Sequence, residues 1–402
     1  MNKPIIRYSQ NPVLEPKEGC TWADTMVLNP AIIKDENTDV LHMLFRATGP
    51  WPSKNLKGKS NPYPIFLGYA KSEDRGETWQ PDFSRPALAP ALEYEQENMY
   101  ITDVYGNRVV NYANGCIEDP RIFYLEGKTY LTVACRMFPP GPYWEGDKRR
   151  DNLPDWAMNP DNPFGTTAYR NDTTTVLFRL DVEKLAKGEY EKAFGYVCRL
   201  TDGNVTDNRD VFFFPEKMRI DGKMQYVMLH RPDNPDKFAA GRGVYKPSIF
   251  LAAAERLEDF VTDKCTHKLL AAGIFEWEEE RVGASFPPIG LGDGKWLVSY
   301  HGKQLPDYGY TQSFMILEEV ENDFPRIIHR CPKRLMYAKQ KWELPDKFEC
   351  PCIFTTGGIV LEDELIMSYG AADQKVGIAW ADFEEIVDYV STFDENGNEI
   401  AD

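Results

Sequence analysis

Short apolar runs separated by polar turns follow one another along the chain in a fixed order. Residues 122–125 form one such run, residues 126–128 form a Gly-containing turn, and residues 130–135 form a second run that ends at Arg136. These runs are rich in β-branched and aromatic residues and are bounded by Gly, Asp and Pro, which favours strands over helices. The pattern therefore predicts two antiparallel strands joined by a tight turn and closed by a polar residue.

The same order occurs five times. The other four copies pair residues 29–33 with 40–45, 210–214 with 226–229, 286–289 with 296–300, and 357–360 with 365–369. A third run follows in each copy, at residues 66–72, 175–180, 248–254, 312–317 and 375–380. Copies at intervals of roughly 70 to 90 residues indicate a repeat architecture. Four-stranded units arranged radially form a propeller, so the sequence predicts an all-β, five-bladed β-propeller; a β-sandwich would not explain the repeated internal order.

Polar residues flank the first two runs of every copy. Because the first strand of a propeller blade lines the central channel, residues at its start should converge on the axis, and residues that close the second strand should lie near the same face. The first group is Asn29, Asp119, Arg209 with Asp210, Ser285 and Gly357, and the second is Arg46, Arg136, His230 with Arg231, His301 and Asp373. Polar groups beside apolar strands need partners. These residues therefore form either an axial site or a set of inter-blade salt bridges and loop caps.

Composition narrows the class of protein. Five copies occupy nearly all of the 402 residues, so one domain spanning residues 1–402 is expected, and 42% apolar residues are enough for a large core. The first 20 residues include five charged ones without the apolar segment of a signal peptide, and no run approaches 18 apolar residues. Eight cysteines scattered through predicted strands are typical of a reducing compartment. We expect a cytoplasmic protein that does not span a membrane.

Charge distinguishes the axial face from the rest of the chain. A net charge of −17 argues against a nucleic acid or an anionic membrane as partner. The axial positions nevertheless collect basic residues: Arg46, Arg121, Arg136, Arg209, His230, Arg231 and His301. A basic pocket in an acidic protein indicates an anionic ligand, with phosphate the first candidate. The alternative is that these arginines pair with Glu118, Asp119, Asp210 and Glu216.

Several motifs now resemble a known family. They are residues 117–122 (IEDPRI), 210–217 (DVFFFPEK), 228–232 (MLHRP), 299–302 (SYHG) and 369–373 (YGAAD), with residues 29–31, 45–47 and 67–70 beside them. In this order, and over the whole chain, they resemble glycoside hydrolase family 130 (GH130). Members of that family are five-bladed propellers that act on β-mannosides. Many are cytosolic phosphorylases that release α-mannose 1-phosphate, and others are hydrolases.

The resemblance implies a role for each matching residue. Asp119 matches the family's catalytic acid, which protonates the scissile oxygen through a sugar hydroxyl while inorganic phosphate attacks from the opposite face with inversion. The implied phosphate-binding residues are Arg209, Arg231, His230, Lys217 and Arg281. Arg281 takes the place of a basic residue, often Lys, that the family has in this region, since Gly290 follows Ile289 here. The implied sugar-binding residues are Asn29, Arg46, Glu118, Arg121, His301 and Asp373.

The chemistry is consistent with these roles without the family name. An inverting cleavage needs an acid on the leaving-group side and a nucleophile on the far side of the ring. If phosphate is that nucleophile, cations must hold it in line and no protein base is required. A hydrolase would instead need a second carboxylate to activate water, and Glu216, Glu278, Glu279 and Glu280 are available.

Residues 138–169 form an insertion rich in Pro, Asp and Trp that is too long for an ordinary blade loop. It is either a surface flap or a lid that stacks Tyr143, Trp144 or Trp156 on the acceptor sugar. Residues 55–61 form a possible second loop of this kind.

The sequence thus predicts inverting phosphorolysis of mannosyl-glucose or a β-manno-oligosaccharide, with Asp119 as the general acid. The alternatives are an inverting β-mannosidase and a non-catalytic sugar-binding propeller. The expected partners are a small oligosaccharide and phosphate, without a metal or organic cofactor, and the chain is possibly a homo-oligomer.

Overall fold

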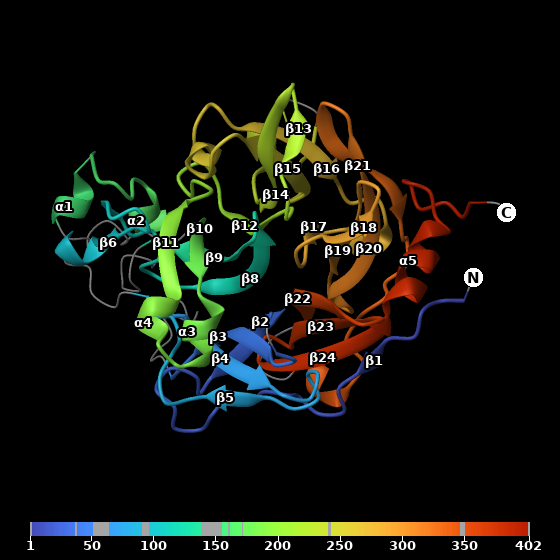
Figure 1. Ribbon diagram of the computed structural model, residues 1–402, viewed down its shortest axis with the longest axis horizontal. Coiled ribbons are helices and arrows are strands. Elements are labelled where there is room, and N and C mark those ends of the chain that lie inside the picture. The colour runs from blue at the N-terminus through green and yellow to red at the C-terminus, as the bar shows by residue number, and fades with distance from the viewer. Residues whose placement is uncertain are drawn as a thin grey trace.

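The computed structural model describes residues 2–36, 38–50, 64–90, 96–137, 155–159, 161–170, 172–239, 243–345 and 350–400. Its strands form five antiparallel sheets of four or five strands that stand around a common centre (Figure 1). This is a five-bladed β-propeller, so the predicted fold class is confirmed.

The blades follow one another along the chain. The first contains β2 (Met26–Lys34), β3 (Leu41–Thr48), β4 (Phe66–Ser72) and β5 (Gln80–Asp82). The second contains β8 (Glu118–Leu125), β9 (Lys128–Arg136), β10 (Thr173–Leu180) and β11 (Phe194–Arg199). The third contains β12 (Asn208–Phe213), β13 (Met218–Ile220), β14 (Lys223–Pro232), β15 (Ile249–Ala254) and β16 (Thr266–Ala271).

The fourth blade contains β17 (Arg281–Ala284), β18 (Ile289–Gly292), β19 (Lys295–Gln304), β20 (Gly309–Val320) and β21 (Asp323–Arg330). The fifth contains β22 (Ile353–Leu361), β23 (Glu364–Ala371) and β24 (Lys375–Asp382), with β1 (Arg7–Tyr8) as its outer strand. Because β1 pairs with β24, the N-terminal segment closes the ring, and both termini lie beside the fifth blade (Figure 1).

The remaining elements lie in the connections. They are β6 (Tyr100–Thr102), β7 (Arg108–Val110), α1 (Asp155–Met158), α2 (Thr167–Arg170), α3 (Val182–Ala186), α4 (Tyr190–Ala193) and α5 (Phe383–Ser391), with 3-10 helices at Gln96–Met99, Pro235–Lys237, Leu257–Val261, Glu276–Glu278 and Lys341–Glu343. Within the described ranges, no helix has the length and apolar character needed to cross a membrane.

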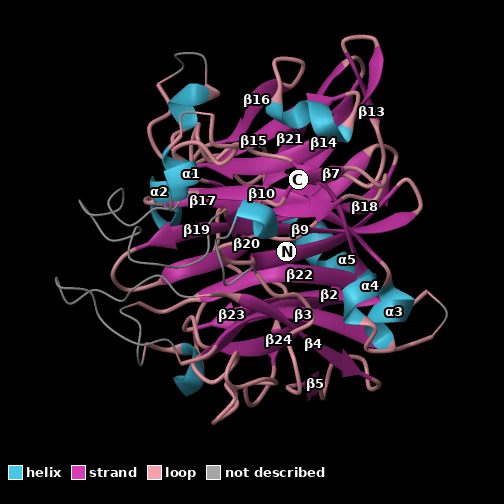
Figure 2. Ribbon diagram, turned by 90° about the vertical axis from the view of Figure 1, so that its left-hand side faces the viewer, coloured by secondary structure: helices cyan, strands magenta, loops and turns pink. Residues whose placement is uncertain are grey.

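The propeller has two distinguishable faces. Seen from the side, α1 and α2, which lie between β9 and β10, are on one face, and α3 and α4, which follow β10, are on the other (Figure 2). We call these the α1 face and the α3 face. The inner strands β2, β8, β12, β17 and β22 surround the centre (Figure 1). Glu118, the first residue of β8, pairs with Ala134 near the end of β9, from which the chain leads to α1. The first residues of the inner strands therefore lie toward the α1 face.

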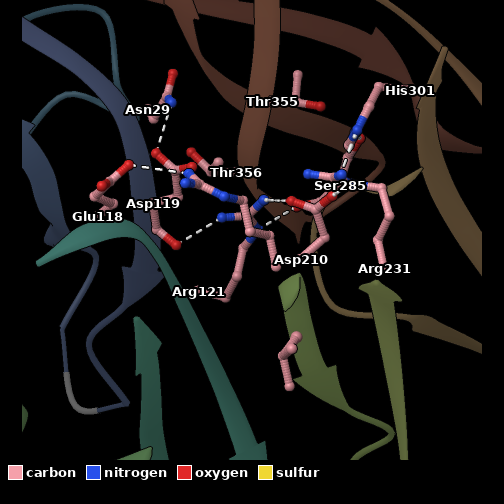
Figure 3. Close-up of polar contacts among 12 residues, drawn as sticks. Asn29, Glu118, Asp119, Arg121, Asp210, Arg231, Ser285, His301, Thr355 and Thr356 are labelled. Atoms are coloured by element: carbon pink, nitrogen blue, oxygen red, sulfur yellow. Dashed lines mark hydrogen bonds and ion pairs between the residues drawn. The ribbon is translucent and has the colours of Figure 1, made fainter. Parts of the chain in front are cut away.

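The expected position of the axial residues needs one correction. Asn29 lies three residues inside β2, Ser285 follows the end of β17, and Gly357 lies four residues inside β22. Gly357 packs against the backbone of Ile32 and the hydroxyl of Ser368, so close that a Cβ would not fit. Its polar neighbours Thr355 and Thr356 are therefore the residues of β22 that lie beside the centre (Figure 3).

The predicted insertion is described only in part. Residues 138–154 and 160, including Tyr143 and Trp144, lie outside the described residues, as does the loop at 55–61. In the described part, Trp156 packs on Phe164 with a ring-centroid distance of 6.3 Å. Phe164 is fully buried in a small cluster with Met99, Met137 and Ala168. This part of the insertion therefore has a packed core of its own.

Candidate active site

Backbone bulges in three inner strands carry the first site residues. Asn29, Asp119 and Asp210 have φ values of 45°, 51° and 55°, and the strand register shifts at each of them. Asn and Asp enter the left-handed region more readily than most residues. A bulge turns a side chain out of the regular alternation of its strand, so all three blades direct a carboxyl or amide group toward the centre.

Asp119 is held by the first blade (Figure 3). Its Oδ1 accepts hydrogen bonds from Asn29 Nδ2 at 2.8 Å and from Arg46 Nη1 at 3.0 Å. Its backbone carbonyl accepts from Arg121 Nη1 at 2.7 Å. The side chain is 10% exposed. Among the described residues, both hydrogen bonds of this carboxyl fall on Oδ1, so the group is fixed in orientation while retaining limited access to solvent.

Glu118 is buried beneath a set of arginines. Its carboxylate lies 3.1 Å from Arg46 and 3.0 Å from both Arg136 and Arg209. Burial raises the pKa of Glu118, but the three guanidinium groups lower it by more, and the net pKa is below its ordinary value. Glu118 is therefore an anion that holds together cations from the first three blades.

A second buried network joins the second, third and fourth blades. Arg121 donates from Nε to the Ser285 carbonyl at 2.5 Å and from Nη2 to Asp210 Oδ1 at 3.2 Å. Asp210 Oδ2 also accepts from Arg231 Nε at 2.5 Å and lies 3.5 Å from His301 Nε2. Burial raises the pKa of Asp210, yet Arg231, His301 and Arg121 lower it below its ordinary value.

The histidine of this network is neutral. Burial lowers the pKa of His301 to about 3 in spite of the charge of Asp210. Its Nδ1 lies 3.3 Å from the Ser285 hydroxyl (Figure 3). Gly283 fits between the two groups, since a Cβ there would lie 2.4 Å from Asp210 Oδ2 and 2.5 Å from His301 Nε2.

The proposed phosphate-binding arginines both have acidic partners. Arg209 donates to Asp207 Oδ1 at 3.1 Å and to Glu118 at 3.0 Å. Arg231 donates to Asp210 and, at 2.9 Å, to Asp233. Pairing with carboxylates, the alternative raised by the sequence, therefore holds for both residues. Asp207 and Asp233 were not singled out from the sequence, although each lies two residues from its arginine.

Arg281 lies beside the same network. Its charge contributes to the lowered pKa of His301, and its Nε is buried with no hydrogen-bond partner among the described residues. The pKa of the Tyr310 phenol is raised by burial and influenced by both Arg281 and Arg231. Lys303, paired with Arg281 across the strands, has its ammonium 5.2 Å from the Tyr310 ring. Tyr310 and Lys303 were not singled out from the sequence, although Lys303 lies two residues from His301 on β19.

Asp373 completes the cluster from the fifth blade. It has a φ of 53° and accepts a weak hydrogen bond from Cys352 Sγ at 3.7 Å. Burial raises the pKa of Asp373, Arg46 lowers it and Asp119 raises it, with a net increase. The effect of these two neighbours indicates that Asp373, Asp119 and Arg46 share one electrostatic environment.

Two of the predicted phosphate-binding residues lie apart from the cluster. His230 points away from Arg231, because side chains alternate along a strand, and lies 3.1 Å from Asn208 Nδ2 and 3.2 Å from His267 Nδ1. Lys217 pairs with Glu126 at 3.3 Å, in the turn at the opposite end of β8 from Glu118. The structure thus corrects the expectation that these two residues join the arginines.

The carboxylates suggested for water activation are also elsewhere. Glu278 is buried and binds Arg330 at 2.9 Å. Glu279 and Glu280 are exposed, and so is Glu216, which lies near the α3 face where Pro215 accepts a hydrogen bond from Glu126. In the described ranges no group of three or more His, Cys, Asp and Glu side chains is arranged to hold a metal ion.

Comparisons with known proteins find similar chains among mannoside phosphorylases. A family model described as β-1,4-mannooligosaccharide phosphorylase matches residues 167–392. A 1,2-β-oligomannan phosphorylase of Thermoanaerobacter sp. (strain X514) is 26% identical over 95% of this chain and 98% of its own. A β-1,2-mannobiose phosphorylase of the same organism is 24% identical over the same shares. The solved structure of a β-1,2-mannobiose phosphorylase from Listeria innocua has a TM-score of 0.63 at 17% identity, covering 96% of this chain and 99% of that one.

Proposed function

The chain belongs to glycoside hydrolase family 130, and from this membership we propose that it is an enzyme that cleaves β-mannosides by phosphorolysis. The substrate is a β-manno-oligosaccharide or mannosyl-glucose, and the product is α-mannose 1-phosphate. The co-substrate is inorganic phosphate, and no metal or organic cofactor takes part. The reaction is a glycosyl transfer to phosphate rather than to water, and it takes place in the cytoplasm.

One observation carries this proposal: Asp119, whose carboxyl group is 10% exposed and turned toward the centre, lies on one side of a cluster to which several arginines contribute. Arg46 lies 3.0 Å from it, while Arg209, Arg231 and Arg281 gather on the third- and fourth-blade side. Phosphorolysis needs this combination, because an acid must protonate the leaving oxygen and cations must hold a phosphate dianion in line.

Phosphorolysis replaces one bond of the anomeric carbon by another. An oxygen of phosphate forms a bond to the anomeric carbon of mannose while the bond from that carbon to the bridging oxygen breaks. Asp119 supplies the proton that the bridging oxygen takes up, through a sugar hydroxyl, and inversion gives the α-phosphate. Since Asn29 and Arg46 both bind Oδ1, Oδ2 is the oxygen that would carry this proton.

The remaining residues then have distinct tasks. Asn29, Arg46 and Asp373 hold the mannose. Glu118 lies beneath Arg46 and Arg209 and orients both. Arg121, Asp210 and His301 form a buried network that holds Arg231 in position. The last three are therefore positioning residues, because each acts through a neighbour.

Hydrolysis is the second candidate, and one observation favours it. The guanidinium groups of Arg209 and Arg231 are each already bound by two carboxylates, which reduces what they offer to phosphate. In that case Asp373, the other carboxyl group beside Asp119, would have to activate water. Its pKa is raised by burial, which disfavours the anionic form that a base requires.

The test is to incubate the protein with β-1,4- and β-1,2-mannobiose, with and without inorganic phosphate, and to follow sugar phosphate by ³¹P NMR. We expect phosphate-dependent formation of α-mannose 1-phosphate, lost in Asp119→Asn. Free mannose released at the same rate without phosphate would overturn phosphorolysis in favour of hydrolysis. Binding of mannosides without cleavage would instead indicate a non-catalytic propeller.

A further inference from the structure

A hollow of about 640 Å³ opens beside the connection between the fourth and fifth blades. Three segments form its walls: the chain before β1, the connection from β16 to β17, and the connection from β21 to β22, with the turn between β19 and β20 at one edge. Its lining includes Lys3, Glu276, Trp277, Tyr308, Lys333 and Arg334. No residue of the axial cluster is among the described residues that line it, so the hollow is a separate feature of the surface.

Four cations gather in and around this hollow. Lys3, Lys333 and Arg334 line it, and Lys339 places its ammonium 4.7 Å from the ring centre of Tyr337, another lining residue. Within the described ranges, none of the four cations forms an ion pair with a carboxylate. The hollow is therefore a concentration of positive charge that the described residues do not neutralise.

These positive charges repel one another. Partial burial lowers the pKa of Lys3, and the charges of Lys339 and Lys333 lower it further, because both effects disfavour a positive charge. The described lining has a single carboxylate, Glu276, whose Oε1 accepts a hydrogen bond from Gln304 Nε2 at 3.1 Å. The chain has a net charge of −17, so carboxylates are plentiful in it. A group of cations without a carboxylate partner in such a chain indicates that a ligand supplies the negative charge.

The arginine of this group is held in place. The Arg334 guanidinium lies 3.8 Å from the ring centre of Tyr308 and donates to Gln304 Oε1. Its Nε is buried without a hydrogen-bond partner among the described residues. Trp277 Nε1 donates to the Pro332 carbonyl at 3.0 Å, which joins two of the walls. Donors that are fixed before a ligand arrives bind it at little ordering cost.

We propose that this hollow is a second anion site, which binds a phosphate group, either free or carried by a small metabolite. Guanidinium and ammonium groups are the usual partners of phosphate, and the volume is in the range of small-molecule sites. The rings of Tyr308 and Tyr337 meet edge-on at 6.4 Å and offer apolar surface to the carbon skeleton of a phosphate ester. This inference goes beyond the proposed phosphorolysis and does not depend on it.

The test is calorimetric titration of three proteins with inorganic phosphate, α-mannose 1-phosphate and adenosine monophosphate, in a buffer without other multivalent anions. The proteins are the wild type, the double variant Lys333→Gln/Arg334→Gln and the control Lys223→Gln/Arg326→Gln. The control removes one lysine and one arginine from exposed ion pairs elsewhere, so both variants lose the same charge. We expect the double variant to bind at least one ligand about tenfold more weakly than the wild type, which is roughly the loss of one charge-assisted contact. The control should match the wild type.

Binding at the proposed catalytic centre has to be separated from binding in the hollow. The same difference should therefore appear when both proteins also carry Arg209→Ala, which weakens the proposed catalytic phosphate site. Because Lys333 is exposed, Lys333→Gln alone should keep the fold and still weaken binding, so the test holds even if the double variant is unstable.

The three ligands distinguish the sources of the phosphate group. Weaker binding of all three by the double variant supports the site and identifies the phosphate group itself as what is recognised. Weaker binding of one ester alone supports the site and identifies the class of metabolite. Equal binding of all three ligands by the wild type and the variants of the hollow, or an equal loss in the control, would overturn the proposal.

Discussion

Glu118 and Asp119 are adjacent carboxyl groups in different surroundings. The carboxylate of Glu118 is 1% exposed and contacts three arginines, whereas the carboxyl group of Asp119 is 10% exposed and contacts one. A buried carboxylate among three cations stays ionised and cannot serve as a proton donor. The bulge that turns Asp119 toward the centre therefore supports the proposed acid role for the second residue of the pair and a structural role for the first.

Exchanging each carboxylate for its amide should separate these roles. Asp119→Asn should abolish turnover with a small loss of stability. Glu118→Gln should lower the free energy of unfolding by about 3 kcal/mol, because removing one partner of a buried pair leaves uncompensated charge. Urea unfolding and the phosphorolysis assay measure both effects. Equal losses of stability in the two variants would contradict the assignment.

Buried neutral histidines should make the fold sensitive to acid. Burial lowers the pKa of His301 to about 3 and that of His267 to about 4, whereas both return to about 6.5 on unfolding. Below pH 6.5 the unfolded chain thus binds protons that the folded protein excludes, so stability falls as the pH falls. Each group contributes a loss of up to about 1.4 kcal/mol per pH unit down to its folded pKa.

The measurement is urea unfolding at pH 7, 6 and 5, above the range in which most carboxylates titrate. The unfolding midpoint should decrease at each step. His267→Gln should make this decrease with pH shallower by the contribution of one histidine. A midpoint that stays constant from pH 7 to pH 5 would show that these histidines are protonated in the folded state.

At the scale of elements, the sequence predicts the strands better than it predicts the β-bulges within them. The alternation of apolar runs and Gly turns defines the five units, and the motif around Asp119 indicates the residue that we propose as the acid. The register shifts at Asn29, Asp119 and Asp210 are not encoded in apolar periodicity, because a bulge adds one residue without changing the composition of its strand.

The same limit explains the two misplaced residues. His230 and Arg231 are adjacent in a basic motif, but strand alternation sends them to opposite sides, and only Arg231 reaches the centre. Lys217 follows the end of β12 and therefore lies at the α3 face, far from the start of that strand. The family motifs implied a shared site for both residues, whereas strand direction and side-chain alternation decide which residues can meet.

The close fit at Gly283 gives a prediction for β17. Gly283→Ala should displace Asp210 and His301, because the added Cβ would lie within 2.5 Å of both side chains. Overpacking of this kind costs about 1–3 kcal/mol, and kcat should fall as Arg231 loses its support. Gly290→Ala in the same blade is the matched control, since its Cβ would meet Trp296 at an ordinary 3.4 Å. If Gly283→Ala behaves like Gly290→Ala in thermal unfolding and in activity, the packing argument is wrong.

At the scale of the whole molecule, the site depends on a closed ring. Side chains from all five blades meet at the centre, so any gap between the first and last blades would change the distance between Asn29 on β2 and Asp373 beyond β23. The chain prevents this by adding β1 to the fifth blade, where Arg7 pairs with Trp380 and Tyr8 with Ala379. The two-residue strand is too short and too polar at its start to be recognised by periodicity, so the five-blade count was predictable while the mode of closure was not.

Tyr8 is the main contact of this closing strand. Its ring meets that of Tyr369 edge-on at 6.2 Å and lies beneath the ammonium of Lys339 at 4.9 Å. Tyr8→Ala should lower the free energy of unfolding by about 2–4 kcal/mol, somewhat below the cost of removing a fully buried aromatic ring. Activity should then fall at temperatures well below that at which the wild type unfolds, because the first and fifth blades separate before the individual blades unfold.

Ile5→Ala provides the control on the same segment. Ile5 is 74% exposed, so its removal should change stability by no more than about 0.5 kcal/mol. Thermal unfolding followed by circular dichroism, together with activity measured across the same temperatures, compares the two variants. Hydrogen exchange should also be faster in β24 and β2 of Tyr8→Ala, because these strands flank the closure. Faster exchange at residues 2–9 alone would contradict this prediction. It would mean that β1 adds to the fifth blade without closing the propeller, which would then be closed by the contacts between β2 and β22 alone.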